Sequence, residues 1–337
     1  MSIWTYVINR AVRAFLLILG IIILTFILSH VLAPNPAYVW AGPHAAPSVI
    51  QAIIKEYHLD QPIYVQLYYY LVSALTFNFG FSPYFKQPVS ELIAIYLPRT
   101  LQLIFVAMIL TGLIGVFTGA FAAEHKDEWG DYTVKALYLI SWCMPPFLAA
   151  LLLQLFIAYY WGVLPPNLMA DPTLAAPRYI TGFPTIDALI EGNWPYFWSS
   201  LKHLILPAFS LALISFGVIT RITRSSMLTA LQADYVRAAV MRGVKKGRIV
   251  YVHALKNSMI PVITLLALVF SWMISGSVII ETIFSYNGLG WLLTTALYNY
   301  DYPAVIGCSV VIGIAVVLAN FIADVLYAVI DPRIKLG

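Results

Sequence analysis

Long apolar runs recur along this chain at a spacing that predicts membrane-spanning helices. About 20 apolar residues are needed to cross a hydrocarbon core, because a helix rises roughly 1.5 Å per residue. Six runs qualify, and five of them are nearly free of charge over their central turns. The fourth is short and is bounded by Lys202, His203 and Arg221. The predicted spans cover residues 12–33, 101–123, 136–160, 203–220, 259–281 and 303–327.

Composition agrees with a protein built for lipid. Hydrophobic residues make up 61% of the chain and charged residues 10%, against about 25% charged in ordinary soluble domains. The mean hydropathy is +0.84. The first run, from Ala14 to Ala33, ends at Pro34-Asn35-Pro36 without a small-residue cleavage site, so we expect a retained helix and not a signal peptide. The predicted fold class is all-α, a polytopic membrane bundle of six transmembrane helices.

The distribution of positive charge predicts the orientation. Fourteen of the 19 Lys and Arg residues lie in the terminal segments and in the segments after the second and fourth runs. Lys and Arg are retained on the cytoplasmic side. We therefore expect both termini in the cytoplasm of a multi-pass cell-membrane protein.

Two outer segments are too long to be simple turns. In residues 34–100, an aromatic-rich stretch from Ile63 to Phe81 is interrupted by Asn78 and Gly80, which favours an interfacial helix over a seventh span. Residues 161–202 are rich in Pro, Gly and aromatics and predict an ordered loop over the outer mouth. We expect a first unit at 1–100 and a core at 101–337, with a cytoplasmic segment at 221–258.

That cytoplasmic segment carries a short helical pattern. Ala239 and Gly243 fall one helical turn apart, near Ala238, and Gly243 is well placed to end the helix. A basic amphipathic helix can also lie on anionic lipid headgroups. Periodicity alone leaves both interpretations open.

The order of motifs along nearly the whole chain resembles the dipeptide/oligopeptide branch of the permeases of binding-protein-dependent ABC importers. The signature loop of such permeases is similar to Asp234–Gly243 followed by Pro261, with Arg237 where Glu is usual. Asn287 stands where Pro is usual, and Asn-Gly also forms a tight turn. The other matching motifs are His58–Gln66, Asn78–Ser82, Leu97–Leu101, Glu281–Phe284, Gly288–Gly290, Asp301–Pro303, Asp324–Tyr327 and Asp331–Ile334.

The resemblance implies a type I importer fold and a division of labour. This chain would form half of a pathway with a second homologous permease, two ATPases would bind the coupling loops, and an extracellular receptor would deliver the solute. No G-x-x-x-x-G-K-[ST] motif occurs, so we expect no cofactor on this chain and ATP-Mg on the partner subunits. The residues implied in coupling are Asp234, Tyr235, Arg237, Ala238, Ala239, Arg242, Gly243, His253, Asn257 and Pro261.

Other classes of function fit less well. An ion-coupled secondary transporter predicts midplane charges and inverted repeats, and a membrane enzyme predicts a motif such as HExxH or GxSxG; the sequence shows none of these. We expect a non-catalytic subunit without a metal site or nucleic-acid partner. For the cargo, the resemblance favours di- or oligopeptides and leaves oligosaccharides or nickel as alternatives.

Several polar or small residues inside the runs have two interpretations each. Glu281 either anchors the turn at 285–290 or acts at an outer gate, and Ser271, Ser275, Gly276 and Ser277 either pack helices or line the pathway. Gly115 and Gly119 predict close helix packing, and Pro145-Pro146 predicts a bend. We expect Asp324 to cap or pair with a basic loop residue. Cys143 and Cys308 are expected to be buried thiols, and His30 and His203 are not expected to be ligands.

Overall fold

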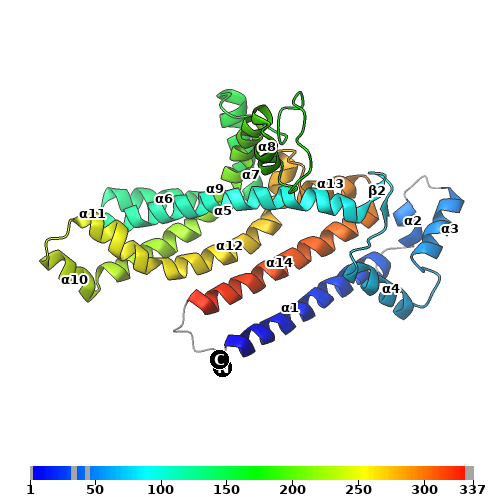
Figure 1. Ribbon diagram of the computed structural model, residues 1–337, viewed down its shortest axis with the longest axis horizontal. Coiled ribbons are helices and arrows are strands. Elements are labelled where there is room, and N and C mark those ends of the chain that lie inside the picture. The colour runs from blue at the N-terminus through cyan, green and yellow to red at the C-terminus, as the bar shows by residue number, and fades with distance from the viewer. Residues whose placement is uncertain (1–2, 32–35, 42–45, 331–337) are drawn as a thin grey trace.

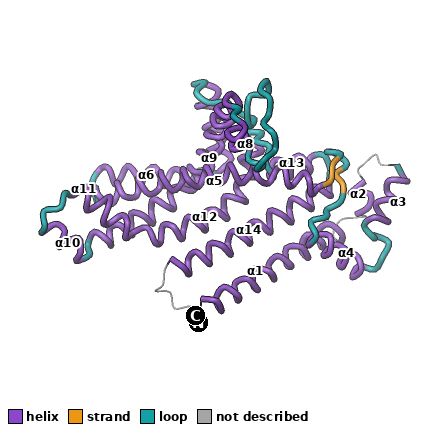
Figure 2. Tube along the Cα trace, viewed as in Figure 1, coloured by secondary structure: helices purple, strands orange, loops and turns teal. Residues whose placement is uncertain are grey.

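The computed structural model describes residues 3–31, 36–41 and 46–330, so the 331–334 motif lies outside the described residues. Within these ranges helices dominate, and one sheet is present, the antiparallel pair β1 (Phe81–Ser82) and β2 (Gln87–Pro88). Figure 2 shows this pair beside the ends of the long helices. The all-α class is confirmed.

Five helical stretches are long and apolar enough to cross a membrane. They confirm five of the predicted spans and lie roughly along the long axis of the molecule, apart from the first turns of α9 (Figure 1). The weakest prediction, 203–220, lies inside the 38-residue helix α9, where the flanking charges are part of the helix. The helices that carry these five spans are α1 (Ile3–Phe26) with η1 (Ile27–Val31), α5 (Val89–Glu124), α9 (Trp194–Leu231), α12 (Leu255–Ile283) and α14 (Tyr302–Ile330).

The third predicted span is broken in two. Helix α6 (Trp129–Cys143) and the continuous pair α7 (Pro146–Leu153) and η2 (Gln154–Tyr160) are bent by 109°. Met144 and Pro145 are extended, and a Pro ring has no N–H with which to continue the helix. The predicted bend is confirmed, but 136–160 is not one continuous helix.

Close helix packing at the glycines of α5 is confirmed. A Cβ added at Gly115 would lie 2.6 Å from Cβ of Ile219, and one added at Gly119 would lie 2.6 Å from Cβ of Thr223. Both contacts are on α9, so the pair of small residues lets the two longest helices approach each other closely.

Short helices flank the long ones (Figure 1). Those at the predicted outer end are α2 (Pro36–Ala41), α3 (Pro47–Glu56), α4 (Ile63–Leu75) and α13 (Leu289–Tyr298), whereas α8 (Pro184–Glu191) lies with α7 beside α5, away from that group. With 13 residues, α4 is about 20 Å long and too short to cross the hydrocarbon core, as the interrupted pattern predicts. The 161–202 segment contains α8 and the first turns of α9 in addition to loop.

Two of the motifs that carried the resemblance meet at the start of α14. Asp301 is buried, its Oδ1 accepts from the backbone N–H of Ala304 at 3.2 Å, and its Oδ2 accepts from Ser82 Oγ. This is an N-cap that also ties β1 to α14. The carboxylate therefore fixes where the last long helix begins.

At the opposite end, Arg10 and Asp324 join α1 to α14 through an ion pair of 2.6 Å between Nη1 and Oδ2. Asp324 does pair with a basic residue, but its partner lies on a helix and not in a loop. Cys308 is fully buried, whereas Cys143 is exposed, contrary to expectation. At the end of α6, Ser141 faces α9 and donates to the carbonyl of Leu213, which leaves Trp142 and Cys143 on the exposed side of the helix.

Candidate functional site

The predicted cytoplasmic helix forms α10 (Asp234–Met241), which projects from the end of the bundle opposite α13 (Figure 1). Its end is a Schellman motif: Gly243 N–H donates to the carbonyl of Val240 at 2.9 Å, and Val244 N–H donates to that of Ala239 at 3.1 Å. Gly243 has φ +71°, a conformation that glycine adopts without strain. The predicted helix end is confirmed, but Gly243 lies beyond the helix and does not share a face with Ala239.

The surface of α10 combines apolar and basic side chains. Met241 is 82% exposed, Val240 60% and Tyr235 40%, whereas Val236 alone turns inward. Exposed basic residues surround them, namely Arg237, Arg242, Lys245, Lys246 and Arg248. Arg237 lies 3.6 Å from Asp234 in an exposed pair within the helix, so its guanidinium is only loosely held. Apolar side chains this exposed at a helix end indicate a surface that another molecule covers.

The remaining residues of the predicted set lie farther along the chain. Short helix α11 (Lys246–Arg248) leads into η3 (Ile249–Ala254), which holds the half-buried His253. Asn257 bonds back to the carbonyl of His253 at 3.1 Å. Pro261 lies inside α12, not at its start. The structure thus separates the set into an α10 group and a group on η3 and α12.

Sequence reasoning missed an ion-pair cluster beside this segment. Asp131 of α6 is fully buried. Arg224 of α9 donates two hydrogen bonds to its carboxylate, from Nε to Oδ1 at 2.7 Å and from Nη2 to Oδ2 at 2.6 Å. Lys135 reaches the same carboxylate at 2.8 Å. Because Asp131 lies 93 residues before Arg224 in the chain, no local sequence pattern predicted their contact.

At the outer end, Glu281 is completely buried and its oxygens are occupied. Thr100 Oγ1 donates to Oε1 at 2.7 Å, and the backbone N–H groups of Gly290 and Trp291 donate to Oε2 at 2.7 and 3.0 Å. These N–H groups belong to the first turn of α13, where a carboxylate is favoured. The geometry supports the anchoring interpretation of Glu281; a gating role stays a prediction.

The small residues of α12 divide between two faces. Ser271 and Ser277 are buried, and Ser277 donates to the carbonyl of Ile274 on its own helix at 3.0 Å. Gly276 lies against Leu211 of α9, at ordinary contact distance for an added Cβ. Ser275 is exposed, on the same face as Trp272. Of the four, Ser275 alone is exposed, and its role in the pathway stays a prediction.

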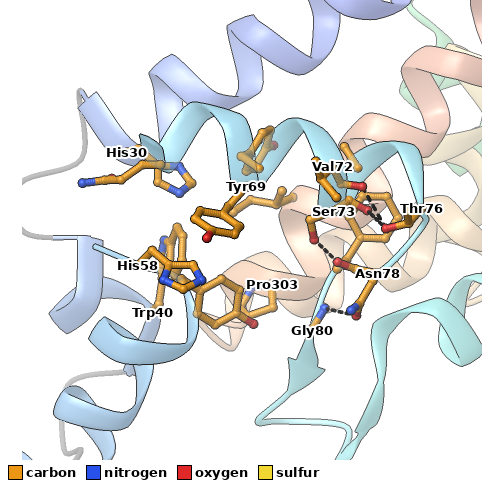
Figure 3. Close-up of a pocket in the computed structure, with 16 residues that line it drawn as sticks. His30, Trp40, His58, Tyr69, Val72, Ser73, Thr76, Asn78, Gly80 and Pro303 are labelled. Carbon is orange, nitrogen blue, oxygen red and sulfur yellow. Dashed lines mark hydrogen bonds between the residues drawn. The ribbon is translucent and has the colours of Figure 1, made fainter. Parts of the chain in front are cut away.

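A cavity of about 270 Å³ lies among η1, α4 and the start of α14, at the outer end (Figure 3). Aromatic rings make up much of its wall: His30 lies at 4.8 Å from Trp40 in an edge-on contact, and His58 stacks on Tyr69 at 3.9 Å. The cavity lies beside the peripheral helix α1, away from the small-residue faces of α12. Among the described residues, no group of three or more His, Cys, Asp or Glu side chains could hold a metal ion.

Comparison with known families defines the class of protein. Residues 115–336 match the family described as binding-protein-dependent transport system inner membrane component, and residues 3–104 match the N-terminal region of such membrane components. The chain belongs to this family. It is a multi-pass cell-membrane permease subunit of a transport system that works with a binding protein and an ATPase.

Individual relatives match over almost their whole length. The chain is 37% identical to a probable D,D-dipeptide transport system permease protein of Escherichia coli (strain K12), over 100% of this chain and 99% of the relative. It is 35% identical to a dipeptide transport system permease protein of Alkalihalophilus pseudofirmus, over 98% and 99%. It is 36% identical to a putative peptide transport system permease protein of Brucella abortus (strain 2308), over 98% of both.

Proposed function

We propose that this chain forms half of a translocation pathway for di- or oligopeptides and is driven through α10 by ATPase subunits. A second, related permease completes the pathway, two ATPases bind the two coupling loops, and an extracellular receptor delivers the peptide. The peptide assignment is supported by relatives that are named as dipeptide or peptide transport permeases and match along the full chain. ATP-Mg is bound by the partner subunits, and this chain performs no catalysis.

The observation that carries the proposal is the exposed apolar end of α10. Met241 and Val240 lie at the end of a helix that points away from the bundle, among five exposed basic residues. A groove on a protein partner buries such side chains and offers carboxylates to the surrounding cations. When ATP draws the two ATPases together, the helices that enter their grooves move with them, and the bundles change from inward-facing to outward-facing.

The test is ATPase capture by the purified permease pair. Met241→Asp places a charge on a side chain that is 82% exposed, so the fold is retained while the apolar contact is lost. We expect at least about tenfold weaker ATPase binding, since a buried unpaired charge at an interface is strongly unfavourable. Gly243→Asp should act in the same direction by straining the φ +71° position that ends α10.

A matched control is Tyr298→Asp, which charges a residue that is 79% exposed at the end of α13, on the outer side. ATPase capture by this variant should equal that of the parent. Normal capture and uptake by Met241→Asp, with the protein correctly inserted, would contradict the assignment of α10 as the docking element. Release of the ATPase by both variants would show that the assay reports general damage.

A further inference from the structure

The turn between α5 and α6 carries a carboxylate at each of its ends. Glu124 is the last residue of α5, and Asp131 lies in the first turn of α6. The backbone N–H of Asp127 donates to Asp131 Oδ2 at 3.1 Å, which closes the turn on itself. Each carboxylate contacts a different limb of the segment that holds α10: the limb that enters α10 is the end of α9, and the limb that leaves it is α11 with η3.

Asp131 holds the limb that enters α10. Its partner Arg224 lies on the cytoplasmic part of α9, ten residues before α10 begins. The two parallel bonds of 2.7 and 2.6 Å form the planar fork that fixes both distance and orientation. Asp131 is fully buried and the Arg224 side chain is 18% exposed, so little water competes for the contact.

Glu124 holds the limb that leaves α10. Tyr251 of η3 donates its hydroxyl to Oε2 at 2.8 Å, and Lys246 of α11 lies 3.8 Å from Oε1. The Glu124 side chain is 15% exposed. The two limbs on either side of α10 are therefore attached to one turn, through two carboxylates only seven residues apart in the chain.

This arrangement constrains how α10 moves. Next to Arg224, Thr223 lies against Gly119 of α5 so closely that an added Cβ would be 2.6 Å from its Cβ, so α5 and α9 form a rigid pair there. A displacement of α10 that pulls on α9 and η3 must carry the α5–α6 turn with it or break the carboxylate contacts. From that turn α6 continues to the 109° break before α7, which packs on α9 and α12.

We propose that Asp131 and Glu124 are positioning residues for transport: they make the α5–α6 turn a second coupling element, which passes the movement of α10 into α5 and α6. This inference rests on the proposed docking of an ATPase at α10. A purely structural ion pair would stabilise the bundle in every state. A transmission contact has an additional effect, since it sets how much uptake each hydrolysed ATP produces.

The experiment uses the full complex of this chain with its second permease, ATPases and receptor, reconstituted in vesicles. Arg224→Lys keeps the charge and removes the fork, and Tyr251→Phe removes the hydroxyl that reaches Glu124. In the double variant we expect normal assembly, basal ATPase activity within about twofold of the parent, and uptake per ATP lowered about tenfold, the size expected for loss of a charge-assisted hydrogen bond. Each single variant should show part of this loss.

Lys135→Gln is the matched control. It removes a contact of 2.8 Å to the same Asp131 carboxylate, but Lys135 and Asp131 lie on the same helix, so no link between limbs is lost. Its uptake per ATP should equal that of the parent. Unchanged uptake per ATP in the double variant overturns the inference. An equal loss of uptake per ATP in Lys135→Gln, or a loss of uptake that lower basal ATPase activity accounts for, also overturns it.

The outcome is separate from the test of the docking helix. If Met241→Asp retains its ATPase, the proposed function itself fails. If the Arg224→Lys/Tyr251→Phe complex retains its ATPase and also retains full uptake per ATP, only the role of the α5–α6 turn fails. Should the double variant assemble poorly, Tyr251→Phe alone decides, because it alters a single exposed hydroxyl contact: reduced uptake per ATP supports the inference and unchanged uptake contradicts it.

Discussion

The contact between α5 and α9 gives the sharpest prediction for the fold. An alanine at position 119 would place its Cβ 2.6 Å from Cβ of Thr223 and 2.7 Å from the carbonyl oxygen of Thr220. Carbon atoms in contact prefer about 3.5–4.0 Å, so the helices must part by about 1 Å at this point. Neither atom is at the end of a flexible side chain, and a rotamer change therefore does not relieve the overlap.

The expected loss of stability in Gly119→Ala is the difference between two opposing contributions. Overpacking of a well-packed site costs about 1–3 kcal/mol, and rigid neighbours put this site near the upper value. Replacing Gly by Ala within a helix contributes about 1 kcal/mol in the favourable direction. Gly119→Ala should therefore lower stability by about 2 kcal/mol, which shifts the unfolding midpoint down by several degrees.

The assay is thermal unfolding of the purified protein in detergent, followed by tryptophan fluorescence. Gly112→Ala, on the same helix, is the control, because its Cβ would meet Leu266 at 3.6 Å, an ordinary contact. The unfolding midpoint of Gly112→Ala should equal or exceed that of the parent protein. A Gly119→Ala midpoint equal to or above that of Gly112→Ala would refute the close approach of α5 and α9.

Two further predictions concern the outer side. Glu281→Gln keeps one acceptor oxygen and replaces the other by an NH2 group, which donates and cannot accept, so Thr100 and the N–H groups of α13 can no longer all donate to the side chain. The unfolding midpoint should fall by the equivalent of about 2–3 kcal/mol; a midpoint equal to the parent's would argue against the anchoring role. For Asp187, burial raises the carboxyl pKa, but hydrogen bonds from Thr181, Ile180 and Gly182 outweigh it, and the net pKa is lowered from 3.8. The charged Asp187 carboxylate therefore stabilises the 161–193 segment above pH 3.8, and this stabilisation is lost as the pH falls through the lowered pKa of the folded state. Proteolysis of the segment should increase only in that acid range. In Asp187→Asn, proteolysis should be equally fast at pH 7 and in acid.

Much of the bundle could be predicted because hydropathy and helix length share one physical cause, the thickness of the hydrocarbon core. Terminal turns outside that core are not under the same constraint, so α9 extends well beyond the predicted 203–220. Pro145-Pro146 predicted a bend, since a Pro ring removes a backbone donor. Its size of 109° depends on packing against other helices, which the local sequence does not encode.

The parts of the candidate site that depend only on neighbouring residues in the chain could be predicted from the sequence. Gly243 ends α10 because the backbone there needs a positive φ, and this is visible from a single residue type at the end of a short helical pattern. The Asp131–Arg224 contact joins residues 93 positions apart and depends on which faces of α6 and α9 meet. Asp131 is one of four carboxylates between residues 124 and 131, and nothing in the local sequence distinguishes it from the three that could equally be solvated.

The central claim is that this chain lacks an energy source of its own and is moved through α10 by a separate ATPase. Peptide uptake into vesicles tests it directly, with the chain reconstituted alone and then together with the second permease, the ATPases and the receptor. We predict that the chain alone produces no accumulation above the external concentration, with or without ATP, and that the full complex accumulates peptide only when ATP is present. Concentrative uptake by the chain alone would contradict the account.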